Sequence, residues 1–117
     1  MNIKNLRKLV FVALLCTAFP ATSMSQGQVV SQAYEILLNN FQAPVSASST
    51  IVFKECDTCE SKYARVTEAT VYSINGKSVR LEDFRVAMLQ TDDRENAAVT
   101  ILHHLESNTV ESIDASI

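Results

Sequence analysis

The sequence predicts a small protein that is mainly β or α+β, in which an N-terminal amphipathic helix precedes an antiparallel sheet. Three observations favour this class. Apolar residues between 28 and 41 fall at helical spacings, apolar and polar residues alternate after residue 50, and an Asn-Gly dipeptide separates two alternating runs. The sheet is expected to be a meander or a partly open barrel of about five short strands.

Residues 1–23 have the pattern of a cleavable signal peptide. Three basic residues precede an apolar core at 9–19, and Pro20 and small residues follow. The core is about 11 residues long, whereas a membrane-spanning helix needs about 20, so no stable span is expected after cleavage. Cleavage is expected after Ala21, Ser23 or Ser25. The short basic start favours a bacterial protein that is exported to the periplasm or secreted.

Processing changes the charge of the chain. Three of the ten Lys and Arg residues leave with the signal while all 13 acidic residues stay, so the mature net charge is −6. An acidic domain without a basic cluster is a poor ligand for phosphate backbones or for anionic membrane surfaces. The composition therefore argues against nucleic acid as a partner.

The remaining chain divides into three predicted parts. Residues 26–42 are expected to form the helix, 43–50 an uncharged linker rich in small and hydroxylated residues, and 51–117 the β-domain. The apolar stripe of the helix consists of Val30, Tyr34, Leu37, Leu38 and Phe41.

Within the β-domain, strands are expected at 50–54, at 63–74 with a bulge or division at 68–69, at 97–105 and at 109–115. Residues 81–89 fit a helix or a strand, and we expect a helical turn that leads into a strand. Asn75-Gly76 predicts a type I′ hairpin turn. Its register pairs Ile74 with Lys77, Tyr72 with Val79 and Thr70 with Leu81.

Cys56 and Cys59 are the two cysteines left after cleavage, and four interpretations of this pair compete. An exported chain meets an oxidising compartment, which favours a structural disulfide. A catalytic dithiol would need a cation or a helix N-terminus to stabilise its thiolate. Instead, acidic residues at 55, 57 and 60 surround the pair. A metal site and two free thiols are the remaining interpretations.

A metal site would add His103 to Cys56 and Cys59. His104 is adjacent to His103 in an expected strand, so their side chains point to opposite faces and at most three ligands converge. The simpler interpretation has His103 on the inner face and His104 on the surface.

No catalytic motif is present, so enzymatic activity and a cofactor are not expected. The sequence favours a small, exported, non-catalytic binding or accessory protein that presents a sheet edge, a groove or its helix to a protein partner of unknown identity. The alternative is a thiol-redox or metal-binding protein that acts through Cys56 and Cys59.

Overall fold

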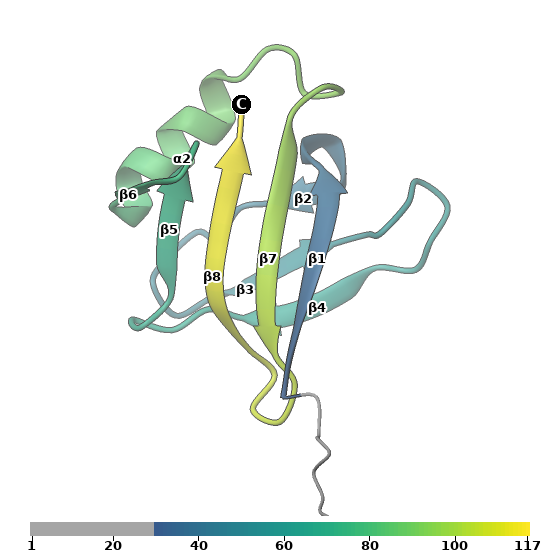
Figure 1. The fold of residues 1–117 in the computed structure, drawn as a ribbon, viewed down its shortest axis with the longest axis vertical. Coiled ribbons are helices and arrows are strands. Elements are labelled where there is room, and N and C mark those ends of the chain that lie inside the picture. Colours follow the sequence, from purple (N-terminus) through teal and green to yellow (C-terminus); the bar gives the residue numbers. More distant parts are fainter. Residues whose placement is uncertain (1–29) are drawn as a thin grey trace, which may run out of the picture.

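The computed structural model describes residues 30–117, which form eight strands, an α-helix and a short 3-10 helix (Figure 1). The elements are β1 (Ser31–Leu37), η2 (Leu38–Asn40), β2 (Phe41–Gln42), β3 (Thr50–Phe53), β4 (Lys62–Arg65), β5 (Val71–Ile74), β6 (Lys77–Val79), α2 (Leu81–Gln90), β7 (Ala98–His104) and β8 (Thr109–Ser116). The expected signal peptide at 1–23, its cleavage sites and residues 26–29 of the expected helix lie outside the described residues.

The strands form one mixed sheet that does not close into a barrel. The expectation of about five strands was wrong, because β1 and β2 come from the segment expected to be helical and the stretch from 63 to 74 divides into β4 and β5. Its order is β1-β7-β8-β4-β3-β2, with β5 beside β8 and β6 beside β5. Both β4 and β5 pair with β8 in parallel, so the expectation of a purely antiparallel sheet was wrong. The physical reason is the connection: α2 and β7 lie between β5 and β8 and form the crossover that parallel neighbours require.

The sheet bends around a single core. In Figure 1, β1, β7, β8 and β5 stand side by side, β3 and β4 cross behind them, and α2 covers the β5 end. The Tyr34 and Phe53 rings lie 5.1 Å apart and join β1 to β3. The Phe84 ring lies 5.2 Å from that of Tyr72, so α2 packs on β5 through aromatic contact.

The expectation of an N-terminal helix was wrong for the described part of 26–42. Residues Ser31–Leu37 form a strand that pairs with β7 along its whole length. Burial alternates, with Tyr34 and Ile36 inside and Glu35 exposed between them. Leu37, which the helical stripe needed, is 44% exposed. The apolar residues fit both the helical spacing and the alternation of a strand. The segment is a strand because it pairs with β7, which lies more than 60 residues away in the sequence.

Residues 43–49 connect β2 to β3; the middle of this segment is exposed, whereas its two ends contact the domain. Pro44 is fully buried. The N–H of Val66 donates to the carbonyl oxygen of Ser49 at 2.8 Å, which ties the end of this segment to the chain that follows β4.

Residues 81–90 are helical throughout, so the expected strand in 81–89 was wrong. Phe84 and Met88 are buried four residues apart on one face. Glu82 and Asp83 occupy the first turn, where the helix dipole favours negative charge. At the other end, Arg94 Nη1 donates to the carbonyl oxygen of Met88 at 2.8 Å.

The Asn75-Gly76 turn has the predicted geometry. The φ angles are 52° at Asn75 and 85° at Gly76, and Ile74 pairs with Lys77 and Tyr72 with Val79. The expected pairing of Thr70 with Leu81 was wrong, because β6 ends at Val79 and Leu81 begins α2. The turn is also fixed to β8, because the N–H of Asn75 donates to Ala115 O at 2.7 Å.

Candidate functional site

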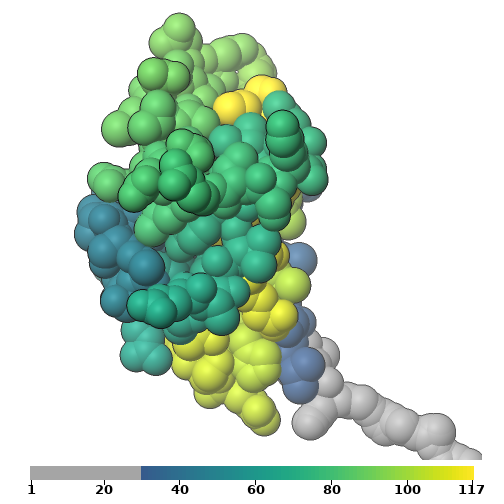
Figure 2. Space-filling model, turned by 90° about the vertical axis from the view of Figure 1, so that its left-hand side faces the viewer, coloured from purple at the N-terminus to yellow at the C-terminus, as the bar shows by residue number. Residues whose placement is uncertain are grey.

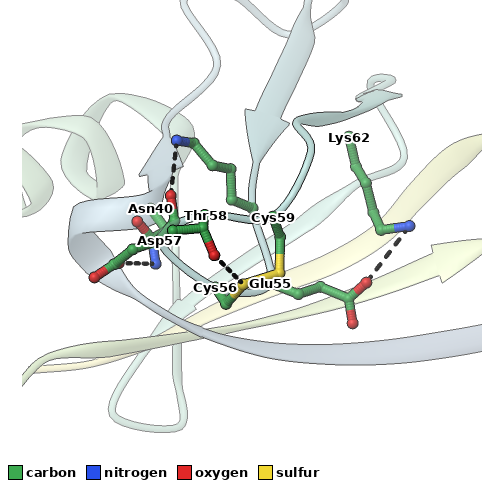
Figure 3. The surroundings of a disulfide bond; sticks show 8 residues. Asn40, Glu55, Cys56, Asp57, Thr58, Cys59 and Lys62 are labelled. Atoms are coloured by element: carbon green, nitrogen blue, oxygen red, sulfur yellow. Dashed lines mark hydrogen bonds and ion pairs between the residues drawn. A yellow bond between two sulfur atoms is a disulfide. The ribbon is translucent and has the colours of Figure 1, made fainter.

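Cys56 and Cys59 form a disulfide in the loop between β3 and β4 (Figure 3). Their Cα atoms are 5.0 Å apart, and the N–H of Cys59 donates to Cys56 O at 3.1 Å. The bridge therefore closes a single turn of a hairpin whose strands pair from Thr50 with Arg65 to Phe53 with Lys62. The covalent bond and the backbone hydrogen bond constrain the same turn.

Polar contacts attach this loop to η2 (Figure 3). Asn40 Nδ2 donates to Asp57 Oδ1 at 3.1 Å, and the N–H of Lys54 donates to Asn40 O at 2.9 Å. Lys62 Nζ lies 3.4 Å from Glu55 Oε2. Two of the acidic side chains around the cysteines therefore have partners, and the loop is held in one position by contacts besides the disulfide.

The chemical capacity of the pair follows from its oxidised state. A disulfide provides no thiolate to ligate a metal or to attack another sulfur. The Sγ of Cys56 has one close polar neighbour, the Thr58 hydroxyl at 3.7 Å, which donates because the bonded sulfur carries no hydrogen. Cys56 is exposed and Cys59 is half-buried.

His103 lies near the end of β7, where its ring packs 6.1 Å from that of Tyr34. Its Nε2 is 2.6 Å from Asn108 Oδ1, so Nε2 carries the proton and donates, while Nδ1 is buried without a partner in the described chain. Cys56 lines the same groove as Ala98 of β7. Ala98 lies five residues before His103, so the Cα atoms of Ala98 and His103 are roughly 16 Å apart along the strand. The structure does not bring Cys56, Cys59 and His103 together. Residues 30–117 contain no cluster of three His, Cys, Asp or Glu side chains suited to a metal.

The outer edge of β1 is a feature that sequence reasoning missed. The N–H of Leu105 donates to Val30 O, and the N–H of Leu38 donates to Ala97 O. The backbone N–H and C=O groups of the even-numbered residues of β1 therefore point toward β7. Because these groups alternate in direction along a strand, those of the odd-numbered residues point away from β7. The odd-numbered residues are Ser31, Ala33, Glu35 and Leu37. No strand of the described chain pairs with this edge (Figure 1).

A groove of about 480 Å³ adjoins the end of this edge. It lies between β1 and the disulfide loop, and it is lined by Glu35, Ile36, Leu37, Asn40, Glu55, Cys56, Asp57 and Ala98. Three of these residues are acidic. The disulfide loop thus forms one wall of the surface at which β1 ends.

A second groove, of about 330 Å³, lies between α2 and the segment that follows β1. Figure 2 shows this side of the molecule, with α2 in green beside the blue segment that includes β2. Leu89 of α2 lines this groove and is apolar, yet it is 79% exposed.

Among the described ionisable groups, Tyr72 is perturbed by its surroundings. Its hydroxyl is buried and has no hydrogen-bond partner, and burial raises the pKa of the phenol above its usual value. The hydroxyl lies in the core between β5 and α2, away from both grooves, so we assign it no chemical role.

Comparison of the chain with protein-family models, with curated proteins and with solved structures found no match. Within residues 30–117, no helix has the length and apolar character needed to cross a membrane.

Proposed function

We propose that this protein is an exported, non-catalytic binding or accessory protein that accepts an extended segment of a protein partner on the edge of β1. The observation that carries the proposal is the run of outward-pointing backbone groups on a seven-residue strand. Strand addition to an exposed edge is a general mode of peptide recognition, in which main-chain hydrogen bonds provide the affinity.

The edge lacks the features by which proteins usually prevent strand addition. Natural edge strands are short, bulged, covered, or carry Lys and Pro. β1 contains neither Lys nor Pro and has one charged residue, Glu35, and its register with β7 is unbroken. Its backbone therefore forms a regular template for another strand.

The disulfide supports this role indirectly. It holds the β3–β4 loop beside the end of β1, where Asp57 contacts Asn40 of η2. A partner strand that passes Leu37 meets this acidic wall, which favours a basic or polar side chain at that point.

A proline at Ala33 tests the proposal. The Ala33 N–H points away from β7, so Ala33→Pro removes an outward donor without breaking a bond of the native ladder. Ala33→Val keeps the donor and favours a strand, so it is the matched control. We expect the partner recovered from the native compartment with wild-type protein to be recovered with the Val variant and lost with the Pro variant.

Hydrogen exchange provides the second readout. In the isolated protein the amides of Ser31, Ala33 and Glu35 should exchange quickly, and partner binding should protect them. Equal recovery with both Ala33 variants, or no protection of these amides in the complex, would show that the partner binds elsewhere.

The second candidate is thiol exchange through Cys56 and Cys59, and the exposure of Cys56 is the observation that favours it. In this function the bridge would be opened by the thiolate of a partner and closed again in each cycle. Reduction of insulin disulfides in a dithiol-coupled assay would support it.

A further inference from the structure

The groove between α2 and the segment after β1 has an apolar floor and an apolar rim. Its apolar lining consists of Leu38, Phe41, Ala43, Val45, Met88 and Leu89. Leu38, Phe41 and Met88 are buried in the floor, whereas Val45 and Leu89 at the rim are 70% and 79% exposed. Exposed aliphatic side chains above an apolar hollow are typical of a ligand site.

The charge of the groove is opposite to that of the molecule. Its two charged lining residues are both arginines, Arg85 and Arg94, although the chain contains 13 acidic residues. Arg94 donates to the carbonyl oxygens of Met88 at 2.8 Å and Leu38 at 3.4 Å, which fixes its guanidinium beside the hollow. Arg85 forms no ion pair with any residue of the described chain.

The size of the groove indicates a small ligand. Its volume of about 330 Å³ is at the lower end of the range for small-molecule sites. A second hollow, of about 400 Å³, shares Val45 and Arg85 with it and continues toward the first turn of α2.

We propose that this groove binds a single-chain aliphatic carboxylate, with the alkyl chain between the exposed side chains of Val45 and Leu89, above the apolar floor, and the carboxylate at Arg85. A carboxylate and a guanidinium form a paired, charge-assisted hydrogen bond. The alkyl chain binds over the apolar floor because this removes its apolar surface from water, as burial in a protein core does. This site is separate from the edge of β1, and it does not depend on the strand-addition proposal.

Titration of protein expressed from the full-length sequence with octanoate, decanoate and dodecanoate tests the proposal by calorimetry and NMR. We expect saturable binding whose affinity rises roughly fourfold for each added methylene until the groove is filled. The neutral alcohol with the chain length of decanoate should bind at least about tenfold more weakly, because it lacks the charge-assisted contact.

Two variants and one control identify the site. Arg85→Gln should weaken decanoate binding roughly tenfold and leave the alcohol unaffected. Leu89→Gln should weaken both ligands, and its exposed position makes unfolding of the domain an unexpected result. Lys77→Gln removes an exposed cation at the β5–β6 turn, away from the groove, and should change neither. Absence of saturable binding, or equal decanoate affinity in the Arg85 and Lys77 variants, would overturn the proposal.

Discussion

Tyr72 places a phenol hydroxyl among apolar side chains, where it has no hydrogen-bond partner in the described chain. A buried polar group without a partner lowers stability, since it loses its bonds to water on folding. Tyr72→Phe should therefore leave the free energy of unfolding unchanged or raise it by about 1 kcal/mol near neutral pH. Urea titration of the two proteins measures the difference, and Tyr63→Phe, at a 60% exposed position, is the control.

The same residue predicts a pH dependence. Burial raises the pKa of Tyr72 above the value of about 10 that it has in the unfolded chain. The folded state thus holds the phenol proton more tightly than the unfolded chain does. Ionisation of Tyr72 therefore leaves stability unchanged below about pH 10 and lowers it as the pH rises from there through the folded pKa. Wild-type protein should lose more stability than Tyr72→Phe above about pH 10. Parallel losses in the two proteins would contradict this.

At the scale of the element, the hairpin of β3 and β4 is held by its backbone ladder and by the disulfide at its tip. A Cys-x-x-Cys bridge closes a short loop, so it contributes about 2 kcal/mol to the free energy of unfolding. The double variant Cys56→Ser with Cys59→Ser should fold, because the ladder and the Asn40–Asp57 contact remain, and it should melt roughly 10 °C lower.

Reduced wild-type protein is the matched control for the double variant and should melt at the same temperature. Partner binding at β1 should survive in both. An unfolded double variant would mean that the ladder alone cannot hold the hairpin. Loss of the biological function with the fold intact would favour thiol exchange at Cys56 and Cys59.

The elements that the sequence predicts well are those defined by local chemistry. Asn75-Gly76 identified its turn because both residues tolerate positive φ, and β8 followed from alternation close to its observed bounds of Thr109–Ser116. The stretch from 63 to 74 divides into β4 and β5 around 68–69, where the sequence allowed a division.

The elements that the sequence does not predict depend on pairing between strands that are far apart in the chain. β1 was mistaken for a helix because its apolar residues fit two periods, and its register with β7 is invisible locally. The parallel pairing of Val71 with Ser112 likewise has no local signal. For the same reason only one candidate site could be predicted. Cys56 and Cys59 lie close together in the sequence, whereas the open edge of β1 is defined only by the strand order of the sheet.

At the scale of the whole molecule, acidic charge is spread widely and the groove beside α2 is a local exception. The mature chain would carry a net charge of −6, yet the lining of that groove is apolar and basic. The outer edge of β1 and this groove share no lining residue, because the groove is formed by α2 and by the chain that follows β1. One molecule could therefore hold a partner strand and a small ligand together. Such an arrangement suits an accessory protein whose binding surfaces act independently.

The proposed export would link the N-terminal sequence to the disulfide, because a Cys-x-x-Cys bridge persists in an oxidising compartment and is generally reduced in the cytosol. We expect the intact mass of exported protein to show loss of residues 1–21, 1–23 or 1–25, with Cys56 and Cys59 blocked to alkylation. Leu14→Arg places a charge in the apolar core of the signal and should leave an unprocessed chain with alkylatable thiols. Wild-type chain that keeps residues 1–23 in the cytosol would contradict export, and it would remove the compartment argument for the disulfide.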